Sequence, residues 1–201
     1  MSEATSAPVG TPVGFGSDWR QVGDPEAFTS SDGAMRVTAP AGADLFSMPG
    51  SYEGSGAPML RRTIRGDFTA WSRVSVSGEK FADAGGLSLH AADGWFKLCL
   101  ERTRGGGWAV VTVLSRPHSD EAMGPALPGP DAELLLTRQG TRYAAFVRVA
   151  DGLGWRFART FTGFDDAEPE LGLFAQAPFS PSCTAIFSPL SLGTKALRDS
   201  R

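Results

Sequence analysis

The stretch GWFKLCLE (94–101) alternates between apolar and chemically varied residues. Its apolar positions are Phe96, Leu98 and Leu100, and its other positions are Trp95, Lys97, Cys99 and Glu101. Because successive side chains of a strand point to opposite faces, this period of two predicts a strand with one face in a core. The other face, which we call the mixed face, would carry an indole, an amine, a thiol and a carboxylate. It is a binding surface, a catalytic site or a solvated outer face.

The dipeptide Asp93-Gly94 predicts a hairpin before this strand, because a two-residue type I′ turn needs positive φ at both positions. The pairs expected from this turn are His90 with Lys97, Ser88 with Cys99, and Gly86 with Glu101. Since glycine has no side chain, we expect a hollow beside the Glu101 carboxylate.

The glycine-rich loop 104–107 predicts a second turn, which brings a third strand against the second. The expected register places Val111 and Val113 on the leucine face and adds Thr112 to the mixed face. A shift of one residue would mix the two faces, so their separation across three strands favours this register.

Similar alternation continues along the chain, where 25 glycines and 14 prolines separate short apolar runs. The expected strands lie near 34–39, 59–65, 67–77, 86–92, 95–102, 109–115, 133–138, 142–149, 155–161, 170–177 and 183–191. No segment shows helical periodicity, so we expect an all-β fold, a single β-sandwich over residues 15–193. Residues 1–14 are expected to form a flexible arm and residues 194–201 a polar tail.

Composition and charge argue against several classes of protein. The net charge is −3 without a run of basic residues, so we expect no nucleic-acid partner. No apolar run approaches the roughly 18 residues of a membrane helix, so no membrane partner is expected. The N-terminus lacks the basic and apolar regions of a secretory signal, and the two cysteines form no CxxC motif. These features favour a cytoplasmic protein.

The mixed face has the ingredients of a sugar-binding site. An aromatic ring such as that of Trp95 can pack against C–H groups, while Lys97 and Glu101 can hydrogen-bond to hydroxyls. Gln176, which precedes the Pro-rich turn APFSPS (177–182), is a further candidate, and we expect Cys183 to lie near it across a hairpin. The alternative is a solvated face on which the charged residues only keep the protein soluble.

Catalytic and metal sites have less support from the sequence. A glycosidase needs two carboxyl groups about 5 to 10 Å apart, and the candidate partner for Glu101 is Asp120, expected in a loop near Lys97. A Cys99–His90 nucleophile pair lacks an oxyanion hole and an orienting third group. With two histidines in the chain, we expect neither a metal site nor a cofactor. The protein is therefore expected to bind a ligand without catalysis.

Five segments of the chain form a pattern that extends beyond the mixed face. They are PAGADLF (40–46), GDFTAWSRVSV (66–76), FADAGGLSLHAADGWFKLCLE (81–101), VVTVLSRPHSDE (110–121) and LGLFAQAPFSPSCTAIFSPLSLG (171–193). This set resembles the DUF1349 family of concanavalin A-like proteins, which includes a yeast protein described as a regulator of enolase. The matching positions are Asp83, Trp95, Lys97, Cys99, Glu101, Ser119, Asp120, Gln176 and Cys183. The chain departs from the family pattern at Glu121-Ala122-Met123 and at Val147.

The resemblance implies a jelly-roll β-sandwich of two antiparallel sheets with a curved front sheet. The expected ligand-binding residues are Trp95, Lys97, Cys99, Glu101 and His90 on the concave face, with Asp120 and Gln176 at its rim. The leading hypothesis is a non-catalytic domain that binds a saccharide or a similar polyhydroxy ligand. The second is a cytosolic protein-interaction or regulatory module, as the enolase regulator suggests. The third is a glycoside hydrolase that uses Glu101 and Asp120.

Overall fold

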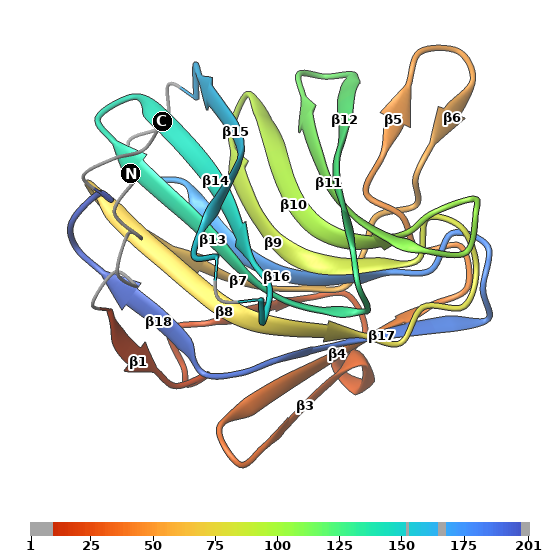
Figure 1. The fold of residues 1–201 in the computed structure, drawn as a ribbon, viewed down its shortest axis with the longest axis horizontal. Coiled ribbons are helices and arrows are strands. Elements are labelled where there is room, and N and C mark those ends of the chain that lie inside the picture. Colours follow the sequence, from red (N-terminus) through yellow and green to blue (C-terminus); the bar gives the residue numbers. More distant parts are fainter. Residues whose placement is uncertain (1–9, 152, 165–167, 198–201) are drawn as a thin grey trace.

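The computed structural model describes residues 10–151, 153–164 and 168–197 and contains two large antiparallel sheets (Figure 1). Within these residues, seven strands of the nine-stranded sheet follow the order β15 (Arg156–Thr162), β14 (Arg142–Arg148), β13 (Asp131–Gln139), β8 (Phe68–Val76), β17 (Ser182–Phe187), β4 (Ala34–Pro40) and β3 (Phe28–Ser31). The other two strands branch from this path: β18 (Leu190–Gly193) pairs with β8, and β1 (Thr11–Val13) pairs with β18. The seven-stranded sheet has the order β12 (Ser119–Leu127), β11 (Trp108–Ser115), β10 (Gly94–Arg102), β9 (Ala84–Ala91), β16 (Glu170–Gln176), β7 (Met59–Thr63) and β2 (Arg20–Val22). The predicted all-β sandwich of two antiparallel sheets is confirmed.

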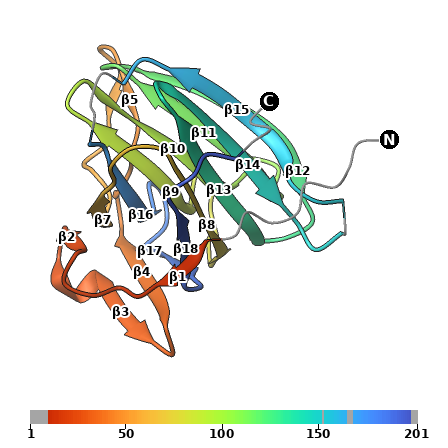
Figure 2. The same ribbon diagram turned by 90° about the vertical axis from the view of Figure 1, so that its left-hand side faces the viewer.

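Two small elements lie outside these sheets. The hairpin of β5 (Ser47–Met48) and β6 (Tyr52–Glu53) projects from the body beside β11 and β12 (Figure 1). The 3-10 turn η1 (Pro25–Ala27) precedes β3, which extends beyond the body of the sandwich together with one end of β4 (Figures 1 and 2). Among the described residues there is no helix long and apolar enough to cross a membrane.

The core fills the space between the two sheets. Leu87, Leu98 and Leu100 of the seven-stranded sheet belong to the same hydrophobic cluster as Val74 and Leu134 of the nine-stranded sheet. All five side chains are fully buried. Because burying one such side chain stabilises a fold by about 1.5–3 kcal/mol, the apolar face predicted for GWFKLCLE is a main support of the sandwich.

Every strand predicted from the alternation is present, with ends within about two residues of those expected. The predicted strand 183–191 is divided into β17 and β18 at Ser188-Pro189, because proline has no N–H to donate to a neighbouring strand. The segment that contains Asp120 and Glu121, predicted to be a loop, is the edge strand β12. All but the two end residues of β12 are exposed, so no alternation of apolar and polar residues marked it.

The predicted register of the first hairpin is wrong by two residues. The turn consists of Ala92 and Asp93, so Trp95 lies opposite His90. Gly94 belongs to β10, where a Cβ atom would lie 2.2 Å from the Ser115 carbonyl oxygen, so the glycine permits the close approach of β11. A shift of two residues leaves every side chain on its own face, and the prediction of the faces was therefore correct.

The missing side chain of Gly86 does not leave the hollow that was predicted from it. Gly86 lies opposite Cys99, and a Cβ atom added at Gly86 would lie 2.1 Å from the Leu98 carbonyl oxygen. The neighbouring backbone therefore occupies the space that the missing side chain leaves.

The predicted register between β10 and β11 is wrong by one residue. The turn has five residues, 103–107, because the Thr103 hydroxyl accepts a hydrogen bond from the Gly107 N–H at 3.1 Å and Gly106 adopts a φ of +78°. Val113 therefore lies opposite Lys97 and shares its face, while Thr112 lies on the core face opposite Leu98.

The N-terminal boundary of the sandwich lies earlier than predicted. Thr11–Val13 form β1, which pairs with β18. Part of the arm predicted over 1–14 is thus a strand, and residues 1–9 lie outside the described residues.

The C-terminal segment also packs on the sandwich. Leu197 is buried, its N–H donates a hydrogen bond to the Thr137 hydroxyl at 2.9 Å, and the Lys195 carbonyl accepts one from Thr69 at 2.8 Å. The polar tail predicted over 194–201 therefore belongs to the domain as far as residue 197, and residues 198–201 lie outside the described residues.

The close approach of the two sheets can be tested at Gly85. A Cβ atom there would lie 2.4 Å from the Ala185 Cβ on the opposite sheet. We expect Gly85→Ala to destabilise the protein by about 1–3 kcal/mol, because overpacking forces the sheets apart. Thermal unfolding should show a Tm lower by several degrees than that of Gly129→Ala, a matched control with open space around the added methyl group. Equal Tm values for the two variants would contradict this packing.

Candidate functional site

One face of the seven-stranded sheet is turned away from the sandwich core, and we call it the outer face. Its side chains include Ser88, His90, Trp95, Lys97, Cys99, Glu101, Val111, Val113, Phe174 and Gln176. The segment 43–57 crosses this face, held by bridges from Ala43 to Ala177 and from Asp44 to Gly56. Leu45 and Ala57 of this segment form a second apolar cluster with outer-face residues such as Val113 and Phe174. The predicted mixed face is therefore covered.

The charged and polar groups of the outer face are withdrawn from water. The exposed fractions of Lys97, Glu101 and Gln176 are 1%, 4% and 1%. Lysine and glutamate are seldom buried to this extent, because the charged form of each loses its hydration. The hypothesis of a solvated face with solubilising charges is therefore wrong.

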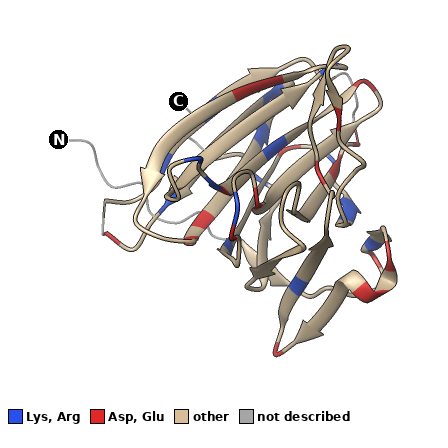
Figure 3. Cartoon of the chain, turned by 90° about the vertical axis from the view of Figure 1, so that its right-hand side faces the viewer, with Lys and Arg blue, Asp and Glu red and all other residues tan. Residues whose placement is uncertain are grey.

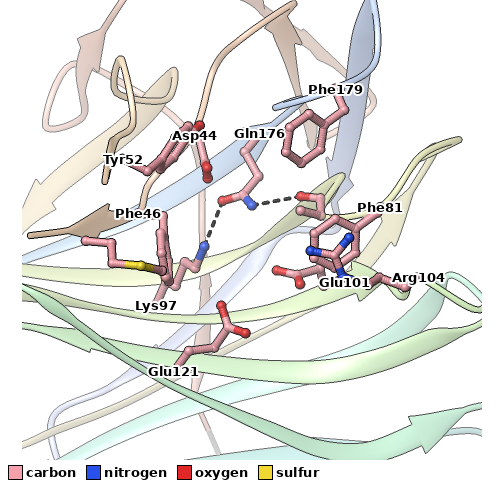
Figure 4. Close-up of a pocket in the computed structure, with 12 residues that line it drawn as sticks. Asp44, Phe46, Tyr52, Phe81, Lys97, Glu101, Arg104, Glu121, Gln176 and Phe179 are labelled. Carbon is pink, nitrogen blue, oxygen red and sulfur yellow. Dashed lines mark hydrogen bonds between the residues drawn. The ribbon is translucent and has the colours of Figure 1, made fainter. Parts of the chain in front are cut away.

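A chain of hydrogen bonds holds Lys97 in place (Figure 4). The Lys97 ammonium donates to Gln176 Oε1 at 3.0 Å, and Gln176 Nε2 donates to the Ala82 carbonyl at 2.8 Å. Ala82 has a φ of +65°, which an alanine adopts only when its surroundings hold it there. Both polar ends of Gln176 are thus used, and the amide fixes the direction of the lysine.

A pocket of about 310 Å³ opens above this chain (Figure 4). It is lined by Asp44, Phe46, Met48, Tyr52, Phe81, Ala82, Lys97, Glu101, Arg104, Glu121, Gln176 and Phe179. The polar floor is formed by Lys97, Glu101, Gln176 and Asp44, and four aromatic rings stand around it. Apolar walls with a few convergent polar groups are typical of a small-molecule site.

The carboxyl groups of the pocket are electrostatically coupled. The pKa of Glu101 is raised to about 7: burial is the main cause, Lys97 opposes it, and Glu121 and Asp44 add to it. Glu101 can therefore donate or accept a proton near neutral pH. Asp44 Oδ1 is buried and has no hydrogen-bond partner among the described residues. Burial, together with the Asp44 carboxylate, raises the pKa of Tyr52 to about 12.

Of the residues expected to bind a ligand, the structure brings Lys97, Glu101 and Gln176 together in the pocket, and it places Cys99 beneath it. The Cys99 thiol is fully buried and donates to the Val111 carbonyl at 3.5 Å. Burial raises its pKa, so this thiol is a poor nucleophile.

Trp95 and His90 lie away from the pocket, toward the other end of β10. Trp95 packs against the second apolar cluster, and His90 Nε2 lies 3.0 Å from the Ser88 hydroxyl. Burial, with Arg61 and Arg20 nearby, lowers the pKa of His90 to about 3. His90 is also four residues along β9 from Gly86, the partner of Cys99, so the structure gives no support to a Cys–His pair.

Asp120 is not part of the pocket. It lies opposite Leu114 on β11, and its carboxylate pairs with Arg159 at 3.2 Å. The next residue, Glu121, lies opposite Val113 and lines the pocket instead. Asp120 and Glu121 have different surroundings because they are adjacent residues of the strand β12, and adjacent residues of a strand point to opposite faces.

The predicted neighbour of Gln176, Cys183, is also elsewhere. β16 and β17 belong to different sheets, and Cys183 packs in the sandwich core. Both cysteines are free. The described residues contain no cluster of histidine, cysteine and carboxylate side chains that could hold a metal ion.

Sequence analysis missed most of the pocket wall. Asp44, Phe46 and Tyr52 come from the covering segment, while Phe81, Arg104 and Phe179 come from loops. Asp44 and Phe46 lie within PAGADLF, so the family pattern was a signal that could have drawn attention to them.

Charged positions of both signs are interspersed along the strands and loops (Figure 3). Within the pocket itself Lys97 and Arg104 stand against Asp44, Glu101 and Glu121. The site therefore offers both hydrogen-bond donors and acceptors rather than a field of one sign.

Comparison with known proteins identifies a family without a known activity. The sequence profile described as "Protein of unknown function (DUF1349)" matches residues 22–195. None of the curated proteins compared with this chain matches it.

Solved structures share the fold at low sequence identity. A functionally unknown protein from Saccharomyces cerevisiae superposes with a TM-score of 0.80 and 20% identity, covering 90% of this chain and 98% of the yeast chain. A Bacteroides ovatus xyloglucan PUL GH43B has a TM-score of 0.69 and 16% identity, covering 96% of this chain and 40% of its own. A xylan beta-1,4-xylosidase from Bacillus halodurans C-125 has a TM-score of 0.71 and 12% identity, covering 92% and 38%. At these identities the likeness shows the fold alone.

The raised pKa of Glu101 predicts a pH dependence of stability. The native state binds this proton more tightly than the unfolded chain, so the contribution of Glu101 to stability falls as pH rises from about 4.5 to about 7. We expect Glu101→Gln to stabilise the protein more at pH 8 than at pH 5, by up to about 3 kcal/mol.

Urea unfolding at the two pH values measures this difference, with Glu26→Gln as the control because Glu26 is exposed on η1. An effect of Glu101→Gln that is the same at both pH values would contradict a buried, high-pKa carboxyl.

Proposed function

This chain belongs to the DUF1349 family, and we propose that it is a non-catalytic domain that binds a neutral saccharide or similar polyhydroxy ligand in the pocket above Lys97. One observation carries the proposal. The Lys97 ammonium, 1% exposed, lies at the floor of an open pocket beside Glu101 and Asp44. Its one described hydrogen bond goes to Gln176, so donor capacity remains for a ligand.

The chemistry of the floor favours hydroxyl groups. Lys97 can only donate, Asp44 Oδ1 has an unused acceptor, and Glu101 can do either near neutral pH. A hydroxyl group both donates and accepts, so one polyhydroxy molecule can satisfy all three. Charges of both signs in the pocket disfavour a strongly anionic or cationic ligand, because either would meet repulsion.

The size of the pocket fits one sugar unit. A volume of about 310 Å³ equals that of roughly ten water molecules, and a hexose has about twelve non-hydrogen atoms. The rings of Phe46 and Tyr52, on one side of the pocket, can pack against its C–H groups.

The comparisons support this proposal only at the level of the fold. The GH43B protein and the xylosidase carry a domain of similar fold, and their names refer to xyloglucan and xylan. This chain spans about 40% of each, so their activities are not transferred.

The other hypotheses have less support from the site. The hydrolase hypothesis loses its predicted second carboxyl group, since Asp120 pairs with Arg159 away from the pocket. The carboxyl groups that do line the pocket with Glu101 are Glu121 and Asp44. An interaction or regulatory module would leave the buried lysine and carboxyl groups without a role. A cytoplasmic location stays a prediction.

The proposal predicts that Lys97→Met abolishes saccharide binding while the fold persists. Lys97→Met keeps the length of the side chain but leaves the buried Gln176 Oε1 without its donor, which lowers stability. Thermal unfolding of the ligand-free variant therefore shows first that it is folded at the temperature of the binding measurement. A panel of mono- and oligosaccharides, screened by thermal shift and confirmed by calorimetry, measures this. A saccharide at 100 times its Kd should stabilise the wild type by about 2.7 kcal/mol, a shift of several degrees.

Lys80→Met is the matched control, because Lys80 is exposed outside the pocket. Wild-type binding by Lys97→Met, or a panel from which no saccharide binds the wild-type protein, would overturn the proposal.

A further inference from the structure

An aromatic row stands at the mouth of the pocket, opposite the β5–β6 hairpin. The rings of Phe81 and Phe179 are stacked, with centroids 6.0 Å apart and planes inclined by 16°. The Arg104 guanidinium lies 3.9 Å from the centroid of Phe81. Figure 4 shows these three side chains together on one side of the polar floor. We call them the aromatic rim.

The loops that carry the aromatic rim are tied to one another. Asp83 Oδ2 accepts hydrogen bonds from the backbone N–H groups of Glu79 and Lys80 at 2.8 and 2.9 Å, and from the Ser180 hydroxyl. The bond from Gln176 to the Ala82 carbonyl ties the same loop to the floor. Phe81 and Phe179 are therefore positioned before any ligand arrives, which lowers the entropic cost of binding.

Phe179 remains 54% exposed although it is stacked. Single exposed phenylalanines are common on protein surfaces, but Phe179 lines a pocket and stacks on Phe81. A flat apolar face beside a guanidinium suits a sugar ring, whose C–H face packs on the aromatic ring and whose hydroxyls accept hydrogen bonds from Arg104.

We propose that the aromatic rim is a second subsite, so that the ligand is the end of an oligosaccharide with its terminal unit on the polar floor and its next unit against Phe179. This inference rests on the proposed function. The pocket, which the three residues of the aromatic rim help to line, accommodates about one unit, so a second unit extends past the mouth along the part of Phe179 that remains exposed. The aromatic rim offers an apolar surface at that point.

The test compares a monosaccharide that binds with its di- and trisaccharide homologues, using calorimetry on the full chain. In the wild type, the disaccharide should bind about three- to tenfold more tightly than the monosaccharide. Phe179→Ala should lose this gain, so that the disaccharide and the monosaccharide bind with equal affinity, while Phe179→Trp should keep the gain. Phe157→Ala is the matched control, because Phe157 is similarly exposed on the nine-stranded sheet.

The outcomes separate this inference from the proposed function. Equal affinities for the monosaccharide and its homologues would overturn the second subsite and leave the first intact. An equal loss of affinity for all ligands in Phe179→Ala would also overturn it, because the ring would then belong to the first subsite. Absence of any saccharide binding by the wild type would overturn both.

Discussion

The site depends on the covering of one face of the seven-stranded sheet by the segment 43–57. A strand that carries Lys97 and Glu101 would ordinarily turn these groups to water. Here Leu45 and Ala57 form an apolar cluster with Phe174 and its neighbours, and the covering leaves an opening above the polar end of the sheet. Burying an amine and a carboxyl group costs free energy that a solvated face would avoid. The arrangement therefore gives up stability to place a polar floor in the pocket.

The remaining parts of the site follow from this constraint. Because Glu101 is buried beside other carboxyl groups, its pKa is raised to about 7 and it can serve as donor or acceptor. Because Lys97 is buried, Gln176 and the Ala82 carbonyl are needed to direct it. Asp83 lies outside the pocket lining but holds the same loop. Its carboxylate accepts hydrogen bonds from the backbone N–H of Glu79 and from the Ser180 hydroxyl. Asp83 and Gln176 thus both hold the loop that carries Ala82.

The sequence could predict the fold because apolar residues recur with a period of two along strands such as β4, β8 and β10. The same period could not set the register, since a shift of two residues between β9 and β10 leaves the faces unchanged. The period of two also could not set the register at β11, because both faces of this strand are apolar: Val110 faces the core and Val111 faces the second apolar cluster. Lys97, Glu101 and Gln176 were found because charged or amide groups stood out in apolar strands. Asp44, Tyr52 and Phe179 were missed because distant loops bring them in, and no local pattern encodes that contact.

The central claim is that the outer face is a buried polar site, and a carbon-detected NMR titration of the Glu101 carboxyl tests it most directly. Because segment 43–57 covers this face, we expect a carboxyl signal that titrates with a pKa of about 7. That signal should be absent from the spectra of Glu101→Gln. A Glu101 pKa near its ordinary value of 4.5 would show that water reaches the carboxyl freely. That result would contradict the burial of the polar floor on which the proposed binding function rests.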